Sequence, residues 1–126
     1  MSGRYLLDSH ILIWLDSGND RLTPVILETL RHAEQRYLSA ATAWELGLKQ
    51  SAGKLRLRMP IGTMLESFRL TELSVSIRHG DRAVLLPLIH RDPFDRLLVA
   101  QALVEGLILV TGDKKLAEYG VPVLLV

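Results

Sequence analysis

Short strand-like segments, most of them strongly apolar, alternate along this chain with longer segments of helical periodicity. The strand-like segments lie at residues 5–7, 37–39, 72–75, 107–110 and 121–126. Helical patterns cover residues 9–17, 24–35, 40–51, 77–88, 93–106 and 114–119, and another helix begins near residue 60. Buried strands separated by helices are typical of a parallel sheet with helices on both faces. The sequence therefore predicts an α/β fold with a central, mainly parallel sheet.

Composition narrows the function classes. A length of 126 residues fits one domain, residues 1–126, and the absence of cysteine excludes disulfide scaffolds, thiolate-bound zinc and thiol nucleophiles. A net charge of +1 argues against nucleic-acid binding through overall charge, so any phosphate-binding surface has to be a local patch. No apolar run approaches the ~20 residues of a membrane span, and Asp8 interrupts the first apolar segment too early for a secretion signal. We therefore expect a cytoplasmic protein without a membrane partner.

Four acidic residues fall where such a fold places a functional site, because parallel α/β sheets bind ligands outside the carboxyl ends of their strands. Asp8 directly follows the first strand, and Asp113 lies three residues past Val110. Glu45 and Asp95 lie on helices that follow strand-like segments or long loops. Helical spacing places Glu45 at the border of an apolar stripe, so its side chain is expected to point partly inward.

Each acid also has a purely structural explanation. Asp8 and Asp113 are in position to cap the helices that follow them, and Asp95 to interact with a helix dipole. Glu45 has Lys49 four residues later, in the order that favours an exposed ion pair. For each acid considered alone, the sequence does not decide between the structural and the functional explanation.

Taken together, the four carboxylates predict a bound cation or shared protons. If they converge within ~5 Å, each close pair repels by roughly 3 kcal/mol at an effective dielectric constant near 20. A domain with a stability of only ~5–15 kcal/mol cannot hold several such pairs uncompensated. Oxygen ligands without cysteine favour Mg²⁺ or Mn²⁺ over zinc. Such ions activate water and stabilise phosphoryl-transfer transition states.

Four segments resemble, in the same order, the motifs of PIN-domain ribonucleases, and most closely those of the VapC-type toxins of bacterial toxin–antitoxin pairs. The segments are YLLDS at 5–9, SAATAWE at 39–45, HRDPFDRLLVAQA at 90–102 and LVTGD at 109–113. The resemblance extends from residue 5 to the C-terminus, and the string Asp-Pro-Phe-Asp-Arg-Leu-Leu is its most specific part.

This resemblance implies a three-layer α/β/α sandwich that acts as a Mg²⁺- or Mn²⁺-dependent endoribonuclease, with the ion activating the attacking water. The residues that match the family's catalytic and metal-binding acids are Asp8, Glu45, Asp95 and Asp113. Asp8 and Asp95 are expected to be the principal ligands. Ser9 and Thr111 match hydroxyl positions that support the acidic pocket, whereas Asp92 matches a helix cap and is not counted as catalytic.

The resemblance also implies partners: an RNA substrate, a second copy of the chain, and a cognate antitoxin whose C-terminal segment lies in the active-site groove. Leucine-rich helices between residues 22 and 70 offer apolar surface for these contacts, or else form ordinary core. The candidate RNA-binding residues lie in a stretch without acids and are Lys49, Lys54, Arg56 and Arg58. A solvated basic face is the alternative.

Two histidines, His10 and His90, flank the acidic motifs. A general-base role is not favoured for either of them, because a metal-activated water removes the need for one.

Two other function classes are open. A phospho-acceptor receiver domain is also α/β and binds Mg²⁺, but it needs adjacent acids after the first strand and a lysine after the last, where this chain has Asp8-Ser9 and VPVLLV. A non-catalytic domain that binds RNA or a protein partner is the second alternative.

Overall fold

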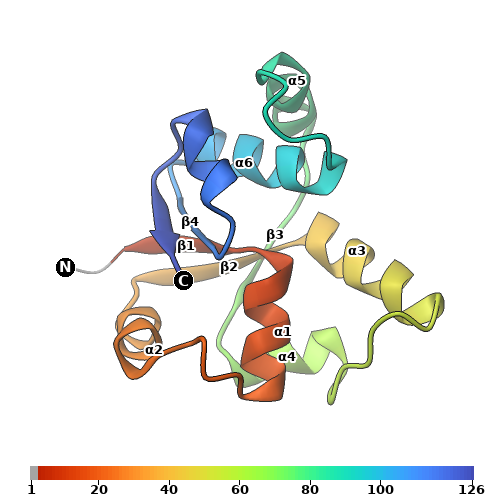
Figure 1. Cartoon of the computed structure of the whole chain (residues 1–126), viewed down its shortest axis with the longest axis vertical. Helices are drawn as coiled ribbons and strands as arrows, with labels where there is room; N and C mark the ends of the chain where they lie inside the picture. Colours follow the sequence, from red (N-terminus) through yellow and green to blue (C-terminus); the bar gives the residue numbers. More distant parts are fainter. Residues whose placement is uncertain (1–2) are drawn as a thin grey trace.

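The computed structural model describes residues 3–126, so the first two residues of the expected domain lie outside the described residues. Strands and helices alternate along the chain (Figure 1). The first half contains β1 (Arg4–Leu7), α1 (Ser9–Ser17), α2 (Pro24–Arg31), β2 (Gln35–Ser39), α3 (Ala40–Ser51) and α4 (Ile61–Ser67). The second half contains β3 (Thr71–Leu73), α5 (Ile77–Leu85), α6 (Pro93–Glu105), β4 (Ile108–Thr111), the 3₁₀ helix η1 (Lys114–Tyr119) and β5 (Val123–Leu125).

The five strands form one sheet in the order β3-β2-β1-β4-β5, and every neighbouring pair is parallel. In the central strand β1, Leu6 lies opposite Tyr37 of β2 and Leu109 of β4. Because all strands run in one direction, their carboxyl ends lie along the same edge of the sheet. The predicted α/β fold with a central parallel sheet is confirmed.

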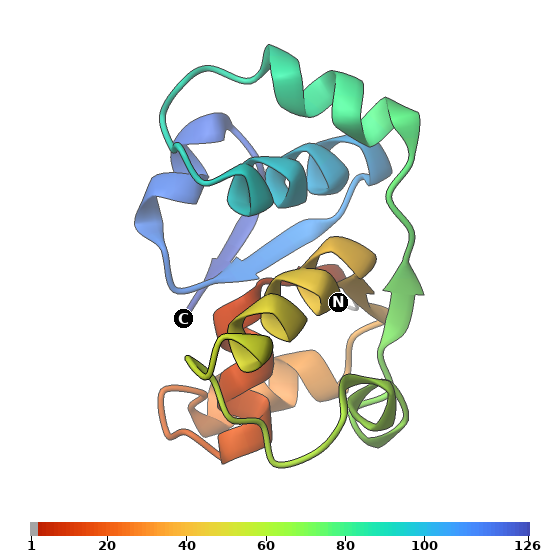
Figure 2. The ribbon, with the colours of Figure 1, turned by 90° about the vertical axis from the view of Figure 1, so that its right-hand side faces the viewer.

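Alternate side chains of the strands enter two separate cores. Leu7 and Val110 pack with the residues of α1, α2, α3 and α4, whereas Leu6 and Leu109 pack with those of α6 and η1. Figure 2 shows the two helical layers on opposite sides of the sheet, with α5 lying on α6. The helices and the sheet thus form the expected three layers. No helix within residues 3–126 is both long and apolar enough to cross a bilayer.

The predicted boundaries differ from the observed ones where tertiary pairing decides them. The helix expected over residues 24–35 ends at Arg31, because Gln35 and Arg36 join the sheet beside Arg4 and Tyr5. The C-terminal strand is shorter than residues 121–126 and begins after Pro122, which has no N–H to donate. Residues 54–58, between α3 and α4, form no strand; their leucines pack against the core and their basic side chains are exposed.

A single side chain, Arg96, holds the connection between α5 and α6. Its guanidinium donates hydrogen bonds of 2.9–3.4 Å to four backbone carbonyls, those of Ala83, Leu86, Pro87 and His90. Carbonyl groups at the end of a helix lack hydrogen-bond donors within the helix, and the Arg96 guanidinium donates to these carbonyls. The loop that carries His90 is thereby fixed to the first turns of α6.

Candidate active site

The four acids singled out in the sequence line one hollow of about 370 Å³ at the carboxyl edge of the sheet. Asp8 follows β1, Asp113 follows β4, and Glu45 and Asp95 come from α3 and α6. The other residues lining this hollow are Ser9, His10, Trp14, Arg21, Lys49, Asp92, Gly112 and Lys114. Residues distant in sequence therefore meet at the edge where the parallel strands end.

Asp8 is buried and has both of its carboxylate oxygens hydrogen-bonded. Oδ1 accepts the Ile11 N–H at 3.1 Å, which makes Asp8 the N-cap of α1, and Oδ2 accepts the Thr111 hydroxyl at 2.5 Å. Thr111 Oγ1 in turn accepts the Asp113 N–H at 3.0 Å. Burial raises the pKa of Asp8, and the hydrogen bonds from Thr111 and Ile11 oppose that rise. Asp8 is thus a helix cap and also part of the site.

Asp95 lies in the first turn of α6, whose N-cap is Asp92. The Asp92 carboxylate accepts the N–H groups of Phe94 and Asp95, so the start of the helix is satisfied without the Asp95 side chain. Burial is the main reason that the pKa of Asp95 rises to about 6, and the charge of Asp92 adds to it. His90 opposes this rise, whereas Asp8 and Glu45 contribute to it. The helix leaves the Asp95 carboxylate free to face the hollow.

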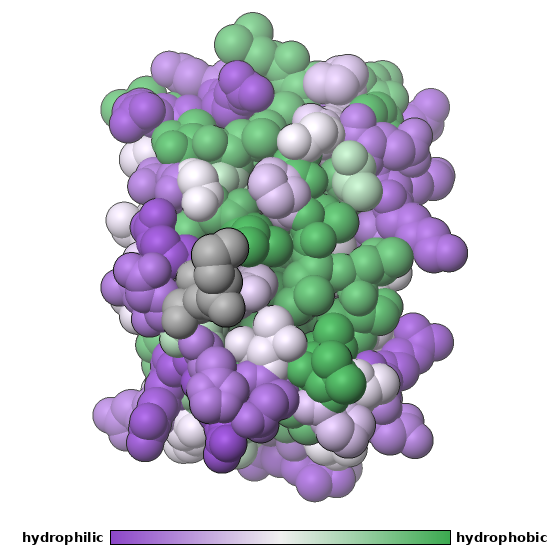
Figure 3. Space-filling model, turned by 90° about the vertical axis from the view of Figure 1, so that its left-hand side faces the viewer, coloured by the Kyte–Doolittle hydropathy of each residue, from purple (hydrophilic) through white to green (hydrophobic). Residues whose placement is uncertain are grey.

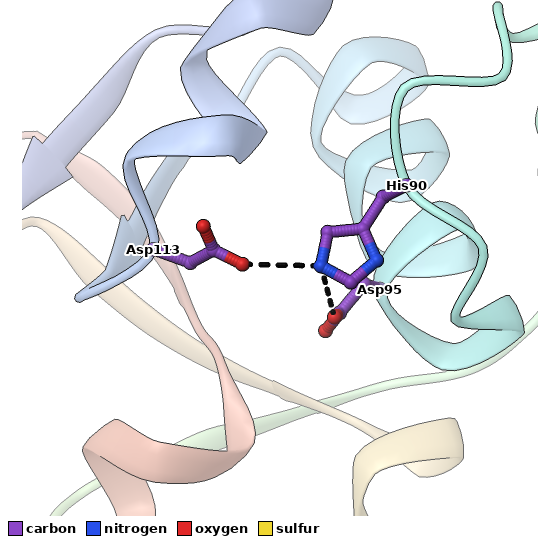
Figure 4. A group of neighbouring side chains, drawn as sticks. All are labelled: His90, Asp95 and Asp113. Atoms are coloured by element: carbon purple, nitrogen blue, oxygen red, sulfur yellow. Dashed lines mark hydrogen bonds and ion pairs between the residues drawn. The ribbon is translucent and has the colours of Figure 1, made fainter.

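His90 lies between two of the acids (Figure 4). Its Nε2 is 3.1 Å from Oδ2 of Asp113 and 3.4 Å from Oδ2 of Asp95. One ligand atom from each of these three residues lies within 4.8 Å of the other two. Asp113 uses its other oxygen, Oδ1, to accept the Lys115 N–H at 2.9 Å and so caps η1.

Glu45 forms the ion pair with Lys49 that its spacing allows, at 3.0 Å, but it is buried and only 8% exposed. The sequence-based alternative of a solvated pair on the helix surface is therefore not what the structure shows. A charged pair at the edge of the hollow lowers the net negative charge there without removing it. Ser9 is also buried beside Asp8 and lines the same hollow.

The donor set of the hollow suits a hard divalent cation. Within residues 3–126, no Lys or Arg side chain forms a salt bridge with Asp8, Asp95 or Asp113. Carboxylate oxygens are the ligands that Mg²⁺ and Mn²⁺ prefer. The raised pKa values of Asp8 and Asp95 mean that an added positive charge relieves an existing electrostatic cost.

Of the four basic residues predicted to bind RNA, only Lys49 lines the hollow. Lys54, Arg56 and Arg58 are exposed on the connection between α3 and α4. Sequence reasoning did not single out Arg21, which lines the hollow and whose guanidinium lies 5.2 Å from the ring centroid of Trp14. Arg21 belongs to none of the sequence motifs. It follows α1 in a turn, and only the folding of the chain brings its side chain to the hollow.

The histidine between the acids was also not assigned a role from the sequence. His90 directly precedes the most specific motif, and this position was the available signal of its role. Arg96, which lies within the motif at residues 90–102, has its guanidinium bound to the α5–α6 connection rather than lining the hollow.

Comparison with known proteins gives matches along nearly the whole chain. The sequence model of the PIN domain family matches residues 5–122. Ribonuclease VapC22 of Mycobacterium tuberculosis (strain ATCC 25618 / H37Rv) is 28% identical over 120 residues, which cover 93% of this chain and 92% of that protein.

Solved structures resemble the whole chain. A toxin-antitoxin complex from Klebsiella pneumoniae contains a chain that is 25% identical, with a TM-score of 0.68 and 95% coverage of both chains. A second match is a chain of VapBC2 from Rickettsia felis, whose crystal structure includes a DNA fragment from the promoter. This chain is 18% identical with a TM-score of 0.74, and the match covers 96% of our chain and 97% of the VapBC2 chain. The fold is therefore shared along nearly the full length of these relatives.

Proposed function

Because this chain belongs to the PIN domain family, we propose that it is a divalent-metal-dependent endoribonuclease and the toxin of a toxin–antitoxin pair. The observation that carries this proposal is the hollow in which acids from four different elements meet, with the pKa of Asp95 raised to about 6. The curated relative is a ribonuclease, and the Klebsiella relative is part of a toxin-antitoxin complex. The substrate class that we propose is RNA, which is hydrolysed at its phosphodiester bonds.

Four carboxylates would hold the metal, Mg²⁺ or Mn²⁺. Asp8 and Asp95 are the proposed principal ligands, and Glu45 and Asp113 bind through water or hold a second ion. When bound, such an ion supplies a Lewis acid that activates water and stabilises the charge of the transferring phosphoryl group.

Other residues around the hollow orient these acids or attract the substrate. Thr111 fixes the Asp8 carboxylate by its hydroxyl, and Asp92 fixes the start of the helix that carries Asp95. Arg21, Lys49 and Lys114 place positive charge around an otherwise acidic hollow. Cationic side chains there attract the RNA backbone, which the acids alone would repel.

Two apolar surfaces fit the proposed protein partners. The first is a hollow of about 560 Å³ whose apolar lining includes Leu15, Leu27, Leu30, Phe68 and Leu70, and which also contains three arginines. Apolar surface with positive charge around it suits an antitoxin segment that carries apolar and acidic side chains. Figure 3 shows one face of the molecule on which apolar side chains lie between hydrophilic margins.

The second surface is the exposed side of α5 and the residues after it, where Ile77, Val84, Leu85 and Leu88 are 75–83% exposed. Exposed apolar side chains gathered on one helix mark an interaction surface, and we assign it to a second copy of the chain. It lies outside residues 22–70, where apolar contact surface was expected.

Cleavage of RNA by the purified protein tests the proposal. We expect cleavage in Mn²⁺ or Mg²⁺, none with a chelator, and a loss of at least ~100-fold in Asp95→Asn. Glu66→Gln is the control, because Glu66 is an exposed acid on α4 that does not line the hollow. Full activity of Asp95→Asn would refute the assignment of that residue.

The same preparations decide between the alternatives. A receiver domain would form a stable acyl phosphate with a small phosphodonor, and a purely binding domain would retain RNA without cutting it in any metal. Sequencing of RNA ends after brief expression of the wild type and of Asp95→Asn would then identify the target.

A further inference from the structure

His90 is held by two hydrogen bonds on the side away from the hollow, and one of them fixes which ring nitrogen carries its proton. Nδ1 accepts the Asp92 N–H at 3.3 Å, and the backbone N–H of His90 donates to the Tyr119 hydroxyl at 2.7 Å. A neutral imidazole has one protonated nitrogen, and the nitrogen that accepts a hydrogen bond is the unprotonated one. The proton of His90 is therefore on Nε2, which faces the hollow.

This Nε2–H points at two carboxylates at once. It lies 3.1 Å from Oδ2 of Asp113 and 3.4 Å from Oδ2 of Asp95, and the imidazole comes from the opposite side to Asp113 (Figure 4). A nitrogen that carries a proton donates hydrogen bonds and cannot ligate a metal. In this arrangement His90 is a donor to the two acids and not a third ligand beside them.

A cation and this N–H require the same oxygen atoms. Oδ1 of Asp113 is already engaged by the Lys115 N–H, so Oδ2 is the oxygen that Asp113 presents to the hollow. A divalent ion bound to Oδ2 of both acids would also meet the positive edge of the imidazole N–H. Binding the ion and keeping the bridge therefore oppose each other.

We infer that His90 is a positioning residue that bridges Asp95 and Asp113 in the ion-free protein and is displaced from them when the divalent ion binds. The inference rests on the proposed metal site. The bridge keeps two like charges together before the ion arrives, and its loss is part of the cost of ion binding.

Two substitutions of His90 separate the two ring nitrogens. In His90→Asn, the amide oxygen lies near the Nδ1 position and can accept the Asp92 N–H, but nothing reaches the two acids. In His90→Gln, the amide nitrogen lies near the Nε2 position and restores a donor to the acids. His32→Asn is the control, because His32 is exposed at the end of α2 and does not line this hollow.

The experiment is a calorimetric titration of each purified variant with Mn²⁺, together with thermal unfolding in a chelator. We expect His90→Asn to bind Mn²⁺ about tenfold more tightly than the wild type, as loss of a hydrogen bond to a charged group implies. Without ions it should unfold ~4 °C lower, because the acids repel each other. His90→Gln should restore both values, and His32→Asn should match the wild type.

Weaker Mn²⁺ binding by His90→Asn would identify His90 as a ligand and overturn the inference, and so would unchanged binding. Neither result would contradict the nuclease proposal. If the wild type bound no Mn²⁺, both would fail, and the absence of metal-dependent RNA cleavage would show it separately.

Discussion

Asp95 lies in the first turn of α6, where the helix dipole favours its ionised form, and yet its pKa rises from 3.8 to about 6. The folded, ion-free protein therefore binds this proton more tightly than the unfolded chain does. The free energy of unfolding falls as the pH rises from 3.8 to about 6 and stays lower above that range. The loss is on the order of 2 kcal/mol, after allowance for the partial exposure of the side chain.

The substitution Asp95→Asn tests this electrostatic cost directly. In a chelator at about pH 7.5, the variant should be more stable than the wild type by ~1–2 kcal/mol, and most of its pH dependence between about pH 4 and 6 should be lost. Urea unfolding at several pH values measures both quantities. A variant that is less stable than the wild type at neutral pH would show that the Asp95 carboxylate is stabilised by its surroundings.

Thr111 carries a second prediction at the level of one side chain. Thr111→Val keeps the shape of this buried residue but removes the donor to Asp8 and the acceptor of the Asp113 N–H. We expect a loss of ~1–3 kcal/mol in stability and weaker Mn²⁺ binding, since the buried Asp8 carboxylate and the partly buried Asp113 N–H each lose a partner. Thr111→Ser should restore most of the metal affinity. Mn²⁺ affinity equal to that of the wild type in Thr111→Val would exclude Thr111 from a supporting role.

At the scale of elements, the connection between α5 and α6 depends on Arg96. Arg96→Ala leaves four backbone carbonyls without that donor and frees the loop that carries His90. We expect a loss of ~2–4 kcal/mol in stability and faster amide hydrogen exchange over residues 83–91. Arg91→Ala, at an exposed position in the same loop, should change neither quantity. Equal exchange in the two variants would show that α6 holds the loop without Arg96.

The connection between α3 and α4 holds three exposed basic side chains on a fixed backbone. Asp16, buried at the end of α1, accepts the Arg58 N–H at 2.8 Å and ties the connection to the body of the protein. Replacing Lys54, Arg56 and Arg58 together by alanine leaves this backbone bond in place. RNA affinity should fall, and the slope of log affinity against log salt concentration should decrease by about 2, as for three lost phosphate contacts. An unchanged slope would remove these residues from the RNA surface.

At the scale of the whole molecule, the exposed apolar side of α5 predicts self-association. Val84→Lys with Leu85→Lys places two charges where these side chains are about 80% exposed. Light scattering after gel filtration should show a dimer for the wild type and a monomer for this variant, with dimer affinity reduced at least ~100-fold. Val25→Lys, on α2, is the control and should leave the dimer intact. A monomeric wild type would contradict the assignment of α5.

The sequence was sufficient for features that depend on local pattern. Apolar segments indicate strands, and polar caps such as Asp8 and Asp92 fix helix starts, so the parallel sheet and the edge that carries the acids could be predicted. The positions of His90, Arg21 and Arg96 could not, because each depends on how separate segments pack. The contacts that a charged side chain makes with other helices and strands cannot be predicted from the residues next to it in the sequence.

Val126 lies close to the site. The Val126 N–H donates to the Thr111 carbonyl at 2.9 Å, two residues before Asp113, whereas Arg4 begins β1 at the far edge of the sheet. A cysteine introduced at Val126, in a sequence that has no other, would consequently carry a label beside the hollow. An environment-sensitive dye attached there would provide an optical reporter of what enters the hollow.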